Sequence, residues 1–276
     1  MSWLEAIVLG IVQALSEFLP ISSSAHVSIV GQLFFSGHDP GAAFTAVTQL
    51  GTQTAVLVYF WKDIVRIAKQ WCLSLIGRVP RNDPDARMGW MIIIGTIPIV
   101  VLGLALQKYI QTTFRNLWVT VFTLAFFAIV LWAADRFGRK TRDLSAMTWQ
   151  HSLIYGFAQA LALVPGVSRS GASITAGLFL GYTRESAARF SFLMSLPAIF
   201  GSGLYELKDI AKDPNPAWGP IALATAIAFG LGYVVIAWLL KYISTHDFKP
   251  FVFYRLGLAA LLAFFLVTNV MTPYGG

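Results

Sequence analysis

Residues 10–27, GIVQALSEFLPISSSAHV, return in altered form at residues 156–173, GFAQALALVPGVSRSGAS. Both stretches contain Gly-x-x-Gln-Ala-Leu, then a proline and a cluster of serines. In each copy an apolar helical run breaks at the proline, Pro20 or Pro165, and the serines that follow are preferred helix N-cap residues. The chain therefore contains an internal duplication, and each copy predicts a short helix, a break and a second short helix.

Composition places this duplication in a membrane. The 276 residues are 57% hydrophobic and 12% charged, and their mean hydropathy of +0.67 is far above that of soluble domains. The cations behind the formal net charge of +7 lie in short loops between apolar runs, so they indicate membrane topology and not nucleic-acid binding. A single cysteine, Cys72, excludes an internal disulfide and a multi-cysteine metal site. No cleavable signal peptide is expected, because the first apolar run lacks a basic start and carries Glu5, Gln13 and Glu17.

Apolar runs of sufficient length predict six transmembrane helices. They cover residues 42–61, 88–106, 117–134, 185–205, 217–240 and 251–271. The pieces that flank the prolines, 3–19 with 23–35 and 148–164 with 170–181, are too short to span well alone. We expect each pair to form a re-entrant helical hairpin, which dips to mid-membrane and returns to the side it came from. The polar and basic residues 62–87 are expected to form a loop.

The distribution of Lys and Arg orients this arrangement. The loops assigned to one side, with Arg255 counted among them, carry fifteen of these cations, the other side carries four, and Arg169 alone lies inside a hairpin. By the positive-inside rule the richer side is cytoplasmic and both termini lie outside. Each half, about 1–140 and 145–276, is then a hairpin plus three spans, and the halves have opposite orientation. The predicted fold is a single all-α polytopic membrane domain made of two inverted-topology repeats, an architecture that places binding sites at the midplane.

The first hairpin carries an ionisable residue where an ordinary membrane segment has only leucines. Gln13 and Glu17 are four residues apart and share one helix face. A carboxylate there can ligate a hard divalent cation or act as a general base, whereas a packing role for a buried ion pair is the simpler alternative. The cost of an ionisable group in lipid favours a functional site.

Serines beside an imidazole follow the first proline. Ser22, Ser23 and His26 offer hydroxyl nucleophiles near a helix start whose backbone N–H groups favour anions. Serines after a proline are also ordinary N-caps, and taken alone this cluster favours that interpretation. The interpretation of this cluster as a functional site gains support from the second copy.

In the second copy the serines surround a guanidinium. Ser168, Ser170 and Ser173 lie around Arg169, whose fork fits phosphate oxygens bidentately; capping of carbonyls is the alternative. Brought together at the midplane, the two copies form an anion site suited to phosphoryl transfer. Since the chain lacks a Gly-rich Lys loop and a large soluble domain, we expect a phosphate carried on a lipid.

At these residues the chain resembles the undecaprenyl-diphosphate phosphatase family, also called the bacitracin-resistance protein family. The resemblance is carried by the Glu/Gln-x-x-x-Glu motif at Gln13 and Glu17, by FLPISS at residues 18–23 with His26, and by PGVSRS at residues 165–170. Weaker similarity covers nearly the whole chain. It includes QLGTQTAVLVYFW at 49–61, GTIPIVVLG at 95–103 and RFSFLMSLPA at 189–198.

The resemblance implies a phosphatase of the bacterial plasma (inner) membrane that removes the terminal phosphate from undecaprenyl diphosphate. The product is the monophosphate carrier of peptidoglycan synthesis. A divalent cation, Mg²⁺ or Ca²⁺, and a site that opens to the outer face are also implied, and a homodimer is left open. The competing hypothesis is an inverted-repeat lipid transporter or flippase without hydrolase activity. A purely structural scaffold would leave Glu17 and Arg169 unexplained.

Motif positions assign roles within this resemblance. Glu17 and Gln13 belong to the metal or base side, Ser23 is the expected nucleophile unless water attacks, and His26 assists proton transfer. The expected diphosphate ligands are Ser22, Ser168, Arg169, Ser170 and Ser173. Gln13 stands where many members have Glu, so ligation from that position is neutral here. Ser173 stands where Thr is common, which keeps the hydroxyl.

Overall fold

The structure, a computed structural model, describes residues 1–35, 41–111, 114, 116–210 and 217–274. Across these ranges the chain is helical and has no β-strand. In order, the helices are α1 (Trp3–Glu17), α2 (Ser23–Phe34), α3 (Gly41–Tyr59), α4 (Trp61–Leu75), α5 (Pro84–Ala105), α6 (Gln107–Gln111), α7 (Leu117–Phe137), α8 (Trp149–Ala160), α9 (Arg169–Phe179), α10 (Arg184–Ile210), α11 (Trp218–Ile243) and α12 (Lys249–Val267). Single 3₁₀ turns lie at Leu144–Ala146 and Leu161–Leu163.

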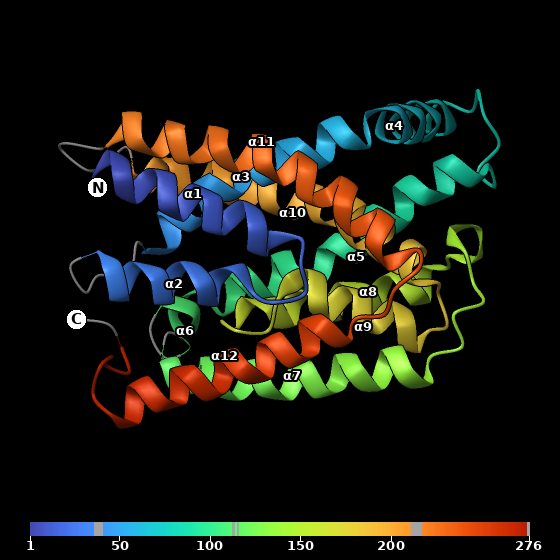
Figure 1. Cartoon of the computed structure of the whole chain (residues 1–276). Helices are drawn as coiled ribbons and strands as arrows, with labels where there is room; N and C mark the ends of the chain where they lie inside the picture. The colour runs from blue at the N-terminus through green and yellow to red at the C-terminus, as the bar shows by residue number, and fades with distance from the viewer. Residues whose placement is uncertain (36–40, 112–113, 115, 211–216, 275–276) are drawn as a thin grey trace.

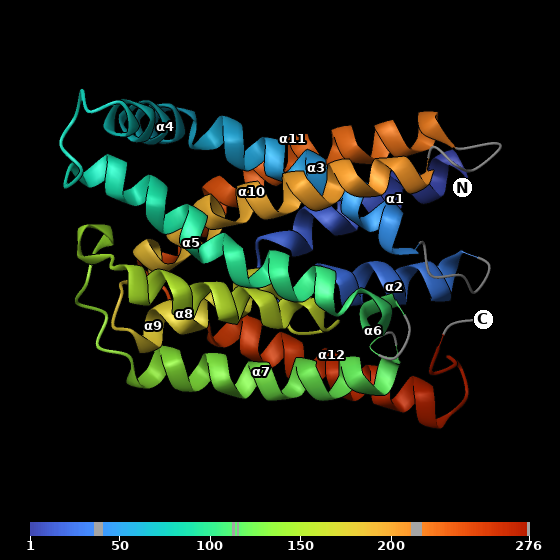
Figure 2. The same ribbon diagram turned by 180° about the vertical axis from the view of Figure 1, so that it is seen from behind.

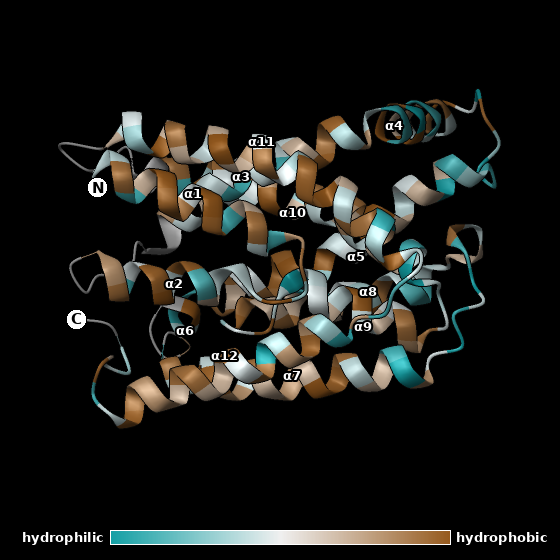
Figure 3. Ribbon diagram, in the orientation of Figure 1, coloured by the Kyte–Doolittle hydropathy of each residue, from teal (hydrophilic) through white to brown (hydrophobic). Residues whose placement is uncertain are grey.

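Long apolar helices make this a multi-pass membrane protein, as predicted. Within the described chain, five helices are long and apolar enough to cross a bilayer: α5, α7, α10, α11 and α12. Figure 3 shows hydrophobic residues along the outer helices α7, α11 and α12. The predicted span 42–61 forms α3, which is absent from those five because threonines and glutamines interrupt its apolar sequence.

Helix α3 is held close to α11 by a glycine. A Cβ at Gly51 would collide with the backbone carbonyl of Thr225, so no larger residue fits there. The polar residues of α3 consequently lie in the interior, and Thr48, Thr52 and Gln53 are fully buried. This packing presents a polar face of α3 to the centre of the molecule.

Both broken hairpins form as predicted. Helix α1 starts at the end of the bundle where the two termini lie, and α8 starts at the opposite end; each turns back near the middle (Figures 1 and 2). The residue before each returning helix has the same left-handed backbone, with φ 75° at Ser22 and φ 69° at Ser168. A positive φ is uncommon outside glycine, so its recurrence shows that the sequence duplication is also a duplication of backbone geometry.

The loop predicted for residues 62–87 is wrong in its first part, where α4 forms. Ile64, Ile67 and Trp71 recur at helical spacing and face inward, and the Trp71 ring packs edge-on against Trp90 of α5 with centroids 5.6 Å apart. The average polarity of the segment hid this apolar stripe, which is the signal of an amphipathic helix. Figure 1 shows α4 end-on while the spans run across the view, so α4 lies across the end of the bundle.

Candidate active site

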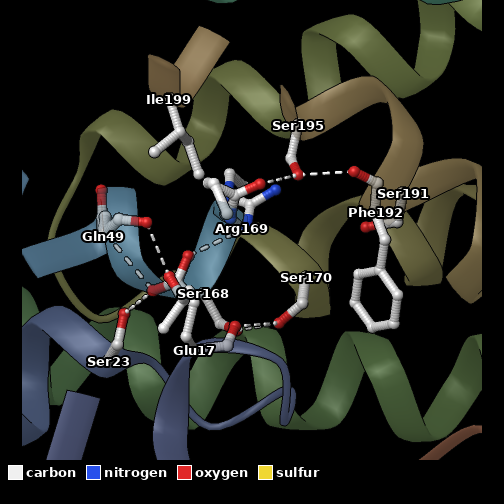
Figure 4. A network of polar contacts seen from close by, with 12 residues as sticks. Glu17, Ser23, Gln49, Ser168, Arg169, Ser170, Ser191, Phe192, Ser195 and Ile199 are labelled. Carbon is white, nitrogen blue, oxygen red and sulfur yellow. Dashed lines mark hydrogen bonds and ion pairs between the residues drawn. The ribbon is translucent and has the colours of Figure 1, made fainter. Parts of the chain in front are cut away.

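Glu17, at the end of α1, is the centre of a network that joins both hairpins. Its side chain is 2% exposed, and Oε1 accepts a hydrogen bond from Arg169 Nη2 of α9 at 2.9 Å. The other oxygen, Oε2, accepts from Ser23 Oγ at 2.6 Å and from Gln13 Nε2 at 2.8 Å. Gln49 Nε2 of α3 lies 3.4 Å from that oxygen. Figure 4 shows this convergence of side chains on one carboxylate.

The structure therefore brings together Gln13, Glu17, Ser23 and Arg169, as the sequence predicted. Glu17 and Arg169 are 152 residues apart in the chain, and their ion pair is almost fully buried. Two buried opposite charges compensate each other, and removal of one leaves the other without a partner. Each charge of the pair therefore compensates the other in the interior of the protein.

Ser23 and His26 do not form the pair that their spacing suggested. His26 Nδ1 lies 2.7 Å from the backbone oxygen of Ser22, and Nε2 lies 2.7 Å from the hydroxyl of Tyr254 on α12. The His26 and Tyr254 rings are also stacked, with centroids 5.5 Å apart. The carboxylate of Glu17, and not the imidazole, is consequently the basic group in contact with the Ser23 hydroxyl.

The serines of the second hairpin fasten the loops to each other. Ser170 Oγ lies 3.2 Å from the Glu17 carbonyl oxygen and 3.1 Å from that of Leu19, which makes it a donor to the first loop. Ser168 Oγ accepts from the Gly171 amide at 3.1 Å and so caps α9. These hydroxyls contact backbone groups, and their expected contact with a diphosphate stays a prediction.

The two other expected ligands have similar partners. Ser173 Oγ donates to the Arg169 carbonyl at 2.7 Å and lies 2.6 Å from Ser191 Oγ of α10. Ser22 Oγ lies 3.2 Å from Ser24 Oγ. Both serines are buried, so either would have to exchange a partner to bind a ligand.

Arg255 of α12 is the residue that sequence reasoning placed wrongly. Counted there among the loop cations, it is in fact fully buried. Its guanidinium donates to five backbone carbonyls, those of Pro20, Thr123, Leu124, Gly166 and Val167, at 2.9–3.3 Å. One carbonyl belongs to the first loop and two belong to the second, so Arg255 ties the loops together.

Gln49 and Tyr254 are further site residues that the sequence did not single out. Gln49 lies in QLGTQTAVLVYFW at 49–61, a stretch that contributed only weaker family similarity. An amide inside a membrane span was the available signal. Tyr254 gave no such signal, because tyrosines are common at membrane interfaces.

The donor set of the site suits a hard cation that also binds phosphate. Within the described residues, no group of three or more His, Cys, Asp or Glu side chains could hold a metal ion. Gln13 Oε1 is nevertheless buried without a hydrogen-bond partner, beside the Glu17 carboxylate and the Ser23 hydroxyl. These are oxygen ligands of the kind that Mg²⁺ and Ca²⁺ take, and Mg²⁺ completes such shells with substrate phosphates. The residues therefore fit a divalent cation bound together with a phosphate group.

Replacing Arg255 with Met should destabilise the protein strongly. The variant leaves three loop carbonyls and two carbonyls of α7 without this donor inside the membrane, at a cost of at least about 3 kcal/mol in the free energy of unfolding. Thermal unfolding of purified protein in detergent measures this loss. The matched control is Lys241→Met, at an exposed cation. Equal melting temperatures for the two variants would show that Arg255 does not hold the loops.

The chain is similar to known proteins over nearly its whole length. The profile of the family described as bacitracin resistance protein BacA matches residues 6–261. A protein of Pseudarthrobacter chlorophenolicus named undecaprenyl-diphosphatase is 58% identical over 268 residues, 95% of this chain and 97% of its own. Proteins of the same name from Renibacterium salmoninarum and Micrococcus luteus are 57% and 54% identical over 280 and 276 residues, and each alignment covers at least 98% of both chains. The chain therefore belongs to the bacitracin resistance protein BacA family.

Proposed function

We propose that this protein hydrolyses undecaprenyl diphosphate to undecaprenyl phosphate and inorganic phosphate, and thereby recycles the lipid carrier of peptidoglycan synthesis. The observation that supports it most is the contact of Arg169, Glu17 and Ser23 across two hairpins inside a membrane protein. A guanidinium to bind phosphate, a carboxylate base and a hydroxyl lie within hydrogen-bond distance of one another. Relatives at 54–58% identity carry the name of this activity.

Substrate binding would redistribute the buried ion pair. Arg169 Nη2 binds Glu17, while Arg169 Nη1 is buried without a partner. A diphosphate offers several anionic oxygens to this unpaired donor and competes with Glu17 for the guanidinium. As Arg169 turns to phosphate, Glu17 Oε1 is released from the guanidinium, and the carboxylate is left to accept a proton.

The chemical step follows from the 2.6 Å contact between Ser23 Oγ and Glu17 Oε2. As the Ser23 oxygen attacks the terminal phosphorus, Glu17 accepts the proton of the Ser23 hydroxyl. The bond from that phosphorus to the bridging oxygen breaks, and undecaprenyl phosphate leaves with the proton that Glu17 accepted. Water then attacks the phosphoserine, releases phosphate and restores the hydroxyl. The alternative is a single displacement in which Glu17 activates a water molecule and Ser23 only orients the phosphate.

A divalent cation, Mg²⁺ or Ca²⁺, completes the proposal. Glu17 and Gln13 would hold it from the protein side, and it would supply neutralisation of charge on the diphosphate oxygens. Arg169 alone offers one positive charge, and this is already compensated by Glu17. A second cation would therefore assist binding of a multiply charged diphosphate.

The finer topology belongs to the same proposal. We place two inverted repeats, about 1–140 and 145–276, in the bacterial plasma membrane, with six spans, both termini outside and the site open to the outer face. Support comes from the hairpins entering at opposite ends of the bundle, and from α3 as the sixth span beside α11. A transporter without hydrolase activity has no support among the relatives, which are named as diphosphatases.

Arg169→Ala should abolish turnover, since it removes the phosphate ligand and leaves Glu17 unpaired. Turnover is measured as phosphate release from undecaprenyl diphosphate by purified protein in detergent, where no membrane exists to be crossed. Arg169→Lys should recover only a minor fraction of wild-type turnover, because the point charge of an ammonium group does not replace a planar guanidinium that binds two oxygens. Near-normal turnover in Arg169→Ala, with a folded protein, would refute the assignment.

Trapping a phosphorylated protein distinguishes the two chemical routes. Wild-type protein quenched in acid during turnover of substrate labelled in the terminal phosphate should retain label on Ser23, and Ser23→Ala should retain none. Mass spectrometry of the labelled peptide identifies the residue. Absence of label, with residual activity in Ser23→Ala, would favour direct attack by water.

Chelation tests the cation. Excess EDTA should silence phosphate release, and added Mg²⁺ or Ca²⁺ should restore it, because Gln13 and Glu17 then regain the ion. Full activity in excess chelator would remove the cation from the mechanism while leaving the roles of Arg169 and Glu17 intact.

A further inference from the structure

Two buried donors, one on Arg169 itself and one on α3, have no hydrogen-bond partner in the part of the chain that the structure describes. One is Arg169 Nη1, and the other is the amide nitrogen of Gln53 on α3. Gln53 is fully buried, and an unpaired amide donor in a dry interior costs free energy. An orphan donor of this kind, together with an orphan guanidinium nitrogen, indicates an absent acceptor with several oxygens.

Gln53 contacts a serine of α10 through one end of its amide. Ser195 Oγ lies 2.8 Å from Gln53 Oε1 and 2.7 Å from the carbonyl oxygen of Phe192, and its single proton is shared between these two acceptors. At the other end of the amide, Nε2 has no partner among the described residues. Ser195 is also fully buried, so water from outside does not reach this contact directly.

The face of α3 that carries Gln53 is turned toward the site. Gln49 and Gln53 are four residues apart, so they lie on one side of the helix, one turn apart. Gln49 Nε2 is 3.4 Å from Glu17 Oε2. In the view of Figure 4, Ser195, the partner of Gln53, lies on the opposite side of Arg169 from Ser23. Gln53 therefore lies one helical turn from a residue that contacts Glu17, on the same side of α3.

We infer that Gln53, oriented by Ser195, is a further ligand of the diphosphate and binds a non-bridging oxygen of the phosphate that Arg169 holds. This inference rests on the proposed function. A neutral amide donor adds a directed hydrogen bond without another charge, and so distinguishes a tetrahedral phosphate from a carboxylate of similar charge. Gln53 takes no part in proton transfer, and its contribution falls on binding.

The alternative is a buried amide that a water molecule satisfies, with a role in packing alone. The two explanations differ in what a change of Gln53 affects. A packing residue alters the melting temperature, whereas a diphosphate ligand alters the dependence of rate on substrate and on competing anions.

The test compares Gln53→Leu with wild type in detergent, using phosphate release from undecaprenyl diphosphate and inhibition by inorganic pyrophosphate. We expect the KM and the inhibition constant of pyrophosphate each to rise about tenfold or more, as loss of one hydrogen bond to a charged group predicts, with kcat within about threefold of wild type. Gln53→Glu, of equal size, should raise both further, because an anion replaces the donor.

The matched control is Gln70→Leu on α4, another glutamine with a buried amide atom that lacks a partner, far from the site (Figure 1). It should leave both constants unchanged. Unchanged constants in Gln53→Leu, or a fall in kcat and melting temperature alone, would overturn the inference. If Gln53→Leu fails to fold, Gln53→Glu decides by the same two constants. Inactivity of the wild-type protein would instead refute the proposed function.

Discussion

Backbone carbonyls released by a broken helix must find donors inside the membrane, because hydrocarbon offers none. Two such breaks meet in this protein, and the donors come largely from one guanidinium. Arg255 binds carbonyls of both loops and of α7, and Gly166, where a side chain would strike Thr123, lets the second loop approach that helix. The buried charge of Arg255 is tolerated because carbonyl dipoles surround it, and the position of every site residue depends on this clamp.

The clamp sets the geometry in which the site can work. With the loops fixed, Glu17 ends one broken helix and Arg169 begins the other, so two charges meet without a long connecting chain. Their pairing stabilises both charges until an anion competes for the guanidinium. The serines around them bind backbone atoms. The side chains that remain free to act are therefore Ser23 and the glutamines of α3.

Sequence patterns predicted the helices well because hydrophobic length and proline breaks are local properties. The same patterns failed for α4, whose apolar stripe is diluted by cations, and for Arg255, which the charge count placed in a loop. They also paired Ser23 with His26 from their nearness in the chain. In the structure the helix start directs the imidazole to Tyr254 and the hydroxyl to Glu17, since side chains three positions apart reach different neighbours.

The sequence by itself determined that the chain crosses a membrane and that two helices break at Pro20 and Pro165, and it predicted Glu17, Ser23 and Arg169 as site residues. Those conclusions follow from composition and spacing, which act over a few residues. Only the tertiary structure decided which base contacts the hydroxyl, that Arg255 joins the loops, and that Gln49 contacts Glu17. Contacts between residues more than a hundred positions apart depend on helix packing, and no local pattern in one sequence specifies it.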